Sequence, residues 1–361
     1  MMTFPATLSP TERILLCIAL AVVIILGIKM IGSTVTIVLV ALILTMLLYP
    51  ATRWLRTKGI PTLAAVTLVT IVAVLCLVVL GLVTLYSFNM IIADMPQYQN
   101  ELTVRFADVT AFLGAHGIST GPLFSTTPDL ASIIPSLLSS LMNISQDLMD
   151  LFFMAATTFF MLLEAPWFIK RVESMLHGEP EKLRQLSRMS GYVIDFIVVR
   201  TETNIIHGTL FGGSLAVMGV HGAILWGVLT CILGYIPYFG LIIAAIPAIF
   251  FAWLQFGLWG AVMVIVIVCI LNLVIENPVF SWLAARKFEI PALVVIISVI
   301  FWGWLFGLAG MLFAVPFTLM LLTLIQFSDE LRWINTLLGV ESLFGKSGTG
   351  PDPGPDPVKE V

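Results

Sequence analysis

The chain has 361 residues, of which 59% are hydrophobic and only 11% charged, about half the charged share of an ordinary soluble domain. A mean hydropathy of +1.07 argues against a water-soluble enzyme, and the positive charges form no basic run of the kind that nucleic-acid-binding proteins need. The charges are also clustered. Glu202 and Glu276 enclose 73 uncharged residues, whereas one membrane span needs about 20. The sequence therefore predicts an all-α polytopic membrane protein.

The first two spans are predicted to form a hairpin. A capping box at Ser9–Glu12, with proline at the first helical position, starts a helix at Pro10 that reaches about Lys29. A second apolar stretch runs from Thr34 to Tyr49, and the connection from Pro50 to Pro61 carries Arg53, Arg56 and Lys58. Because basic loops stay on the cytoplasmic side, we expect this connection and the N-terminus in the cytoplasm.

The next segments alternate between the membrane and its two surfaces. Residues 1–87 contain membrane helices 1 to 3, the third from Thr62 to about Ser87. Residues 88–146 have Arg105 as their only basic residue, which favours an extracytoplasmic location. Apolar residues at helical spacing predict two amphipathic helices there, over Leu102–Leu113 and Leu130–Leu141. Membrane helix 4 follows in residues 147–165.

Residues 166–200 are predicted to be cytoplasmic because they contain six basic residues. We expect the fourth span to end at Glu164–Trp167. Two amphipathic helices should follow, Trp167–Leu176 and Pro180 to about Arg200, and the second runs into the next span.

Residues 201–328 form the C-terminal membrane domain, and parity limits its topology. Both ends of the 73-residue uncharged block lie beside basic residues, so an even number of crossings is required. Four crossings leave about 18 residues each, the short limit, and two spans plus a re-entrant hairpin fit better. A last hairpin should turn at Phe306–Gly310. The total is about eight spans plus the re-entrant element, an even number that returns the tail (329–361) to the cytoplasm. We expect the tail to be disordered from about residue 345.

The tip of the re-entrant hairpin, residues 234–240, is the first candidate for a substrate pathway. Its glycines and its proline break the helix, and broken backbone at membrane depth survives only inside protein or beside a water-filled cavity. The other interpretation is a simple proline-containing turn between two spans. The candidate pathway residues are Tyr235, Pro237, Tyr238, Gly240, Asn204, His207 and Asn272.

Two carboxylates near the inner ends of spans, Glu164 and Glu276, are candidates for ion or proton coupling. Solvation at the cytoplasmic interface explains them equally well. No metal-binding spacing or catalytic motif occurs, and the phosphate-loop-like run Gly339–Ser347 has one residue too many between its glycines and follows a membrane helix. We therefore expect no enzymatic activity, no cofactor and no metal, and transport without ATP hydrolysis.

Several motifs resemble the autoinducer-2 exporter family, also called the PerM-like permeases. Met95–Tyr98 is similar to the branch that contains the quorum-signal transporter. The resemblance covers nearly the whole chain and is carried most specifically by Phe160–Pro166, Tyr235–Gly240, Ala244–Pro247, Ile300–Gly307, Gly310–Leu312 and Val315–Pro316. Two departures stand out. The tip begins with Gly234 where asparagine is usual, and the segment from Glu276 to Pro291 has Phe280–Ser281 and Ala285 in place of the family's Glu-Pro and Gly.

The resemblance implies an eight-span protein of the bacterial inner membrane that exports a small polar signal. It also implies a homo-oligomer, with a pentamer as the expected state. Other members of the family resemble sodium or lithium/proton antiporters, which is one alternative. A second alternative is a membrane scaffold whose outer and cytoplasmic helices recruit partners without transport.

Overall fold

The computed structural model describes residues 10–116, 144–279, 291–328 and 331–340, and every element in these ranges is a helix. Five of the helices are long and apolar enough to cross a membrane, and three shorter ones are also apolar. These findings confirm the all-α polytopic membrane class. The predicted helix Leu130–Leu141, residues 280–290 and the tail from residue 341 lie outside the described residues.

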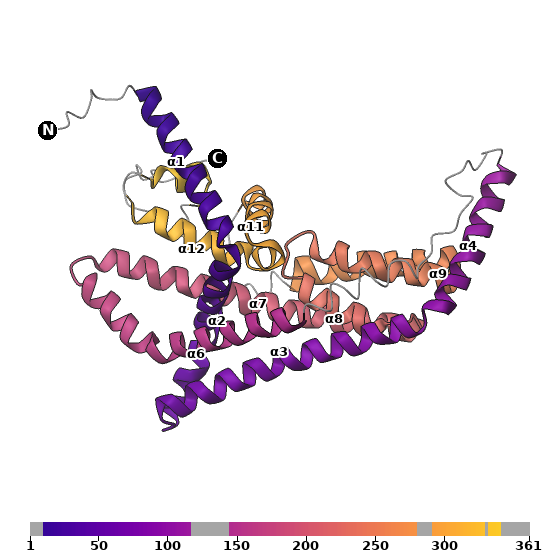
Figure 1. The fold of residues 1–361 in the computed structure, drawn as a ribbon, viewed down its shortest axis with the longest axis horizontal. Coiled ribbons are helices and arrows are strands. Elements are labelled where there is room, and N and C mark those ends of the chain that lie inside the picture. The colour runs from indigo at the N-terminus through magenta and orange to yellow at the C-terminus, as the bar shows by residue number, and fades with distance from the viewer. Residues whose placement is uncertain (1–9, 117–143, 280–290, 329–330, 341–361) are drawn as a thin grey trace, which may run out of the picture.

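The N-terminal part is a series of helices with very short connections. These are α1 (Pro10–Met30), α2 (Gly32–Thr57), α3 (Thr62–Ala93) and α4 (Met95–Ala115). In Figure 1, α3 runs along one long side of the molecule, and α4 turns away at its end beside α9. The connection predicted over Pro50–Pro61 is shorter in the structure, because α2 continues through Pro50 as far as Thr57.

The same correction applies to the fourth span. We expected a separate amphipathic helix, Trp167–Leu176, after the end of the span at Glu164–Trp167, but α6 (Ile144–Met175) runs through Pro166 as one continuous helix. A proline within a helix removes one hydrogen bond, whereas ending the helix leaves several backbone groups without partners. In apolar surroundings the continuous helix is therefore favoured. As predicted, the turn at Gly178 leads into α7 (Pro180–Met218), and α6 and α7 form the hairpin that projects at one end of Figure 1.

Helix α7 and its successor α8 (Ala223–Leu233) pack so closely that glycines are required at their contact. A Cβ atom on Gly208 would lie 2.5 Å from the Gly227 carbonyl oxygen, and one on Gly212 would lie 3.1 Å from the Ala223 carbonyl oxygen. Gly219, in the left-handed conformation with φ 76°, ends α7 and begins the reversal into α8. The glycines at positions 208 and 212 thus allow close packing of two helices within the chain.

Helix α9 (Gly240–Leu271) is a hairpin of two arms that turn at Gly257, where φ is 69°. We call residues 240–256 the first arm and residues 258–271 the second arm. The first arm runs antiparallel to α8: it starts against Leu233, and at its far end Gln255 Oε1 accepts a hydrogen bond from the His221 backbone N–H at 3.2 Å. Helix α8 and the first arm thus form the hairpin predicted around the tip. Its depth in the membrane stays a prediction.

The last elements are η3 (Asn272–Val279), α11 (Ala292–Leu312), α12 (Ala314–Gln326) and the short α13 (Trp333–Leu337). The predicted turn at Phe306–Gly310 is confirmed, because Gly307 has φ 64° and reverses the direction of α11. Ile236 of the tip is 2% exposed and packs with Ala244, Val299 and Ala314. The tip is therefore anchored against α11 and α12 as well as against α7.

Candidate functional site

The tip between α8 and α9 contains an unusual backbone conformation. Tyr238 has φ 65° and is the one non-glycine residue with positive φ among the described residues. The Phe239 N–H donates to the Pro237 carbonyl oxygen at 2.8 Å, which makes Tyr238 the centre of a three-residue γ-turn. Such turns are rare and strained, and strain of this kind persists only where surrounding contacts hold it. The tip therefore stores conformational strain.

Helix α7 supplies side chains that hold the tip. Arg200 is 5% exposed, and its Nε donates to the Gly234 carbonyl oxygen at 2.7 Å. The hydroxyl groups of Thr201 and Tyr235 lie 2.5 Å apart. Because the Thr201 hydroxyl donates its hydrogen to the Ile197 carbonyl oxygen at 2.6 Å, Tyr235 is the donor in this second bond. The tip is thus fixed to α7 through one backbone group and one side chain.

Asn204 lies directly against the start of the tip. A Cβ atom on Gly234 would lie 2.5 Å from Asn204 Oδ1 and 2.9 Å from the Thr230 carbonyl oxygen. Any side chain at position 234 would therefore displace Asn204 or part the two helices. This contact explains why glycine stands at position 234, where the family resemblance led us to expect asparagine.

Two buried polar atoms beside the tip have no hydrogen-bond partner among the described residues. They are Asn204 Nδ2 and Thr230 Oγ1, in side chains that belong to residues 2% and 1% exposed. His207, 4% exposed, lies one turn further along α7. A buried polar group without a partner costs about 1–3 kcal/mol, so this site favours any ligand that supplies the missing hydrogen bonds.

The structure brings together only part of the predicted set. Tyr235, Asn204 and His207 lie on or beside the contact between α7 and the tip, and Gly240 is buried against Leu233. The other predicted positions lie apart from this contact or are more accessible: Pro237 is half-buried, and Tyr238, Asn272 and Glu164 are exposed. Glu164 belongs to α6, which packs chiefly against α2 and α3. The Glu276 side chain lies outside the described residues.

Sequence reasoning missed Arg200, Thr201 and Thr230. Arg200 had been used only as a marker of the cytoplasmic side. A signal was present, because positions 200, 201, 204 and 207 follow helical spacing and share one face of α7. In the described part of the chain, no three His, Cys, Asp or Glu side chains lie close enough to hold a metal ion.

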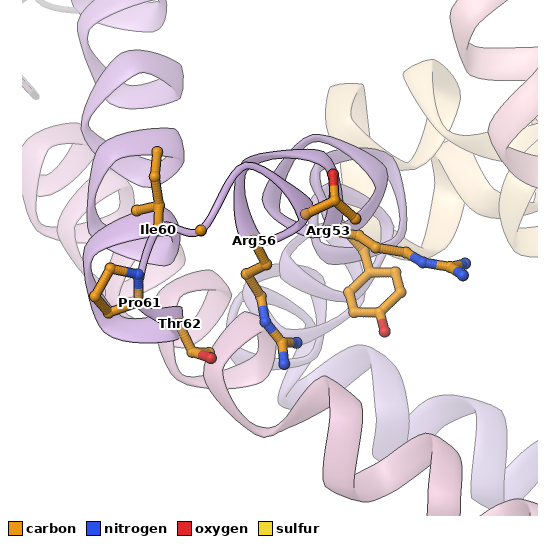
Figure 2. A pocket seen from close by; sticks show the side chains of 8 residues that line it. Arg53, Arg56, Ile60, Pro61 and Thr62 are labelled. Atoms are coloured by element: carbon orange, nitrogen blue, oxygen red, sulfur yellow. The ribbon is translucent and has the colours of Figure 1, made fainter.

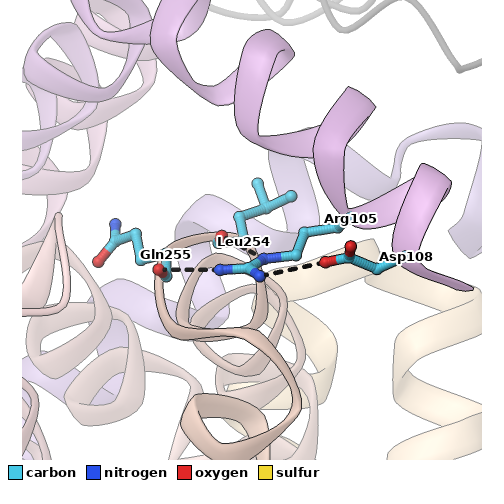
Figure 3. A network of polar contacts seen from close by, with 4 residues as sticks. All are labelled: Arg105, Asp108, Leu254 and Gln255. Atoms are coloured by element: carbon cyan, nitrogen blue, oxygen red, sulfur yellow. Dashed lines mark hydrogen bonds and ion pairs between the residues drawn. The ribbon is translucent and has the colours of Figure 1, made fainter.

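The far end of the first arm is held by Arg105 of α4, which Figure 3 shows. Its Nε donates to the Leu254 carbonyl oxygen at 3.0 Å and one Nη donates to the Gln255 carbonyl oxygen at 3.2 Å. These carbonyls belong to the last turn before the reversal at Gly257, where helical donors are missing. Asp108 pairs with the other Nη at 3.4 Å. Arg105 therefore caps the C-terminal end of the first arm.

Tyr98 of α4 packs beside the same end of the first arm. It is fully buried, and its ring meets the Phe251 ring edge-on with centroids 4.8 Å apart. Burial, with smaller contributions from the charges of Asp94 and Glu101, raises the pKa of Tyr98 to about 12. Its hydroxyl has no hydrogen-bond partner among the described residues. Helix α4 is thus docked on α9 mainly by apolar contact and by Arg105.

Comparisons with known proteins place this architecture in a family. A family model described as AI-2E family transporter matches residues 18–329. The chain is 30% identical to the AI-2 transport protein TqsA of Escherichia coli K12 over 64% of this chain and 68% of that protein. It is 32% identical to a putative transport protein of Haemophilus influenzae, over 68% of this chain and 72% of the relative. It is 27% identical to the putative transport protein YhhT of Escherichia coli K12, over 85% of this chain and 88% of the relative. The chain therefore belongs to the AI-2E transporter family of multi-pass membrane proteins.

Proposed function

We propose that this transporter exports a small, polyhydroxylated signalling molecule of the autoinducer-2 type, without ATP hydrolysis, past the tip and the polar face of α7. The observation that carries the proposal is the pair of buried atoms Asn204 Nδ2 and Thr230 Oγ1, which have no hydrogen-bond partner among the described residues. A solute with several hydroxyl or carbonyl oxygens can accept from Asn204 and exchange a hydrogen bond with Thr230. The name of the relative TqsA supports the choice of solute.

Access to these groups requires movement of the tip. Asn204 and Thr230 are shielded almost completely in the present arrangement, so a solute reaches them only when the tip and α7 separate. The strained γ-turn at Tyr238 lowers the cost of such a change, because strain released in the open state offsets part of the lost contacts. We infer that transport proceeds by rearrangement of α7, α8 and α9 around residues 234–240.

The test is export of labelled autoinducer-2 from liposomes containing the purified protein. Asn204→Ala and Tyr235→Phe should each lower the rate about tenfold or more, because each removes a hydrogen-bonding group at the contact. The matched control is Tyr238→Phe, the same change at the exposed tyrosine of the same tip, which should keep the rate within twofold. The proposal fails if liposomes with and without protein release the solute equally fast.

The same liposomes distinguish the alternatives. A sodium or lithium/proton antiporter that uses Glu164 or Glu276 predicts that sodium collapses an imposed pH gradient, with loss of the effect in Glu276→Gln. A scaffold predicts no flux of either kind. Glu164 lies exposed on α6, apart from the polar contact at the tip, so the geometry favours solute export over coupling through this residue.

We further propose a location in the bacterial inner membrane with both termini in the cytoplasm, and assembly as a homo-oligomer with a pentamer as the expected state. The basic residues in and around the connection from α2 to α3, and those in the last turns of α6 and the first turns of α7, support this orientation. Protease protection of terminal tags in oriented vesicles tests the orientation. Native mass spectrometry of the protein in detergent tests the subunit number.

A further inference from the structure

A hollow at the corner between α2 and α3 has the chemistry of an anion site. It has a volume of about 490 Å³ and is lined by the last turns of α2, the connecting residues and the start of α3. Figure 2 shows the lining side chains, among them Arg53, Arg56, Pro61 and Thr62. Tyr49 and Thr57 add two further hydroxyl groups to the lining. The hollow lies apart from the tip and from α4.

The two arginines have no opposite charge to balance them within reach. Neither forms an ion pair with the residues that the structure describes. In the sequence, no Asp or Glu occurs between Glu12 and Asp94, a stretch that contains both helices of the corner. An anion that pairs with Arg53 or Arg56 would therefore have to come from outside these helices.

The remaining groups suit a phosphate. Guanidinium groups bind phosphate oxygens through paired hydrogen bonds, and hydroxyl groups such as those of Tyr49 and Thr62 add single donors. The hollow also includes the first residues of α3, where the N–H groups of a 32-residue helix lack helical acceptors. Charge, hydrogen-bond donors and helix dipole thus act on the same small volume.

The position of the hollow indicates which molecules could bring a phosphate to it. Both α2 and α3 are long and apolar enough to span a membrane, so their shared corner lies at the level of the lipid headgroups. Trp54 beside it is 60% exposed, with the Lys58 ammonium 5.6 Å from its ring, and exposed tryptophan and lysine at helix ends are typical of that level. We propose that Arg53, Arg56 and the start of α3 bind the phosphate of an anionic phospholipid.

The experiment measures lipid binding to the full chain in detergent by native mass spectrometry, with phosphatidylglycerol, phosphatidylcholine and inorganic phosphate as separate probes. Phosphatidylglycerol should remain bound and raise the melting temperature. Arg53→Gln and Arg56→Gln should each weaken its binding about tenfold, and Arg56→Lys should weaken it less because the charge remains. Lys58→Gln is the matched control, since it removes one positive charge from the same connection but not from the lining.

Each contrary outcome overturns the proposal. Equal weakening by Lys58→Gln indicates diffuse attraction and no built site. Equal binding of phosphatidylcholine contradicts selection for an anionic lipid, and equal stabilisation by inorganic phosphate contradicts a lipid source. The altered arginines are exposed, so the variants should fold, and a single symmetric peak in size-exclusion chromatography verifies this. Lipid binding is measured without transport, so failure here leaves the export proposal standing.

Discussion

The tip and the far end of the first arm of α9 are each held by an arginine that donates to the backbone, but the two places differ in burial. At the tip, Arg200 is 5% exposed and bonds to the Gly234 carbonyl oxygen at 2.7 Å. At the far end, the side chain of Arg105 is 26% exposed and its partner Asp108 is 63% exposed. Water can replace the bonds of Arg105 as they break, whereas it cannot easily reach those of Arg200. The far end should therefore open at much lower cost than the tip.

The largest expected effect tests whether the close approach of α7 and α8 is what fixes the tip. In Gly208→Leu, the first side-chain atom alone would lie 2.5 Å from the Gly227 carbonyl oxygen, so the helices must separate. We expect a loss of at least about 3 kcal/mol in the free energy of unfolding, the upper part of the range for overpacking. Thermal unfolding in detergent measures it.

The control for this change is Gly213→Leu on the same helix. A Cβ atom there meets no atom within 4 Å, so the free energy of unfolding should change by only about 0.5 kcal/mol. If the two variants melt at the same temperature, close packing of α7 on α8 does not fix the tip.

The second prediction concerns Arg200, the buried arginine at the tip. Arg200→Gln takes away the charged donor to the Gly234 carbonyl oxygen and should cost about 1.5–3 kcal/mol, the range for hydrogen bonds to charged groups. Export of labelled solute should fall in parallel, because the tip loses its defined position. Arg188→Gln, at an exposed position of the same helix, should change neither property. A melting temperature equal to that of Arg188→Gln contradicts the assigned role.

The comparison also shows which features a sequence can predict. The breaks at residues 234–240 and at Gly307 were predicted because Gly and Pro act on the backbone locally, whatever packs around them. Helices α2 and α6, in contrast, continue through Pro50 and Pro166, because apolar surroundings favour an unbroken helix over several unpaired backbone groups. Local signals thus identified where the chain can break but not whether it does.

The sequence does not predict which side chains form hydrogen bonds with distant segments of the chain. Arg200 and Arg105 entered the prediction only as charges that report sidedness, since their targets lie 34 and about 150 positions away along the chain. Asn204 and His207 were named for their polarity within an apolar block, and the structure places Asn204 against Gly234. Rare polar residues are therefore visible in such a sequence, while what they bond to is not.

The third prediction concerns Arg105 and the more exposed far end of the first arm of α9. Arg105→Gln removes the donor to the Leu254 and Gln255 carbonyl oxygens and should cost about 1 kcal/mol, less than Arg200→Gln, because water reaches these carbonyls. Asp108→Asn removes only the exposed ion pair and should cost about 0.3–0.5 kcal/mol or less. Amide hydrogen exchange at residues 251–257 should rise in Arg105→Gln but not in Asp108→Asn. The reverse order of costs for the two arginines would overturn the comparison.

The smallest effect at neutral pH comes from Tyr98→Phe, which keeps the apolar contact between α4 and α9 but removes a hydroxyl without a described partner. Stability below pH 9 should be unchanged or slightly higher, because no hydrogen bond in the described structure is lost. In the unchanged protein, the pKa of Tyr98 is about 12 against an ordinary 10, so the folded state holds this proton more tightly than the unfolded chain. Stability should therefore fall above pH 10, by on the order of 2 kcal/mol at pH 12.

Tyr98→Phe should lack this part of the alkaline loss. Unfolding measured between pH 8 and pH 11 shows the start of the difference, and Tyr86→Phe on α3, at a tyrosine that is 62% exposed, should retain the loss in full. Equal pH dependence of the two variants would mean that Tyr98 is not buried against α9 in solution. In that case the far end of the first arm would depend on Arg105 alone, and the cost of opening it would be lower still.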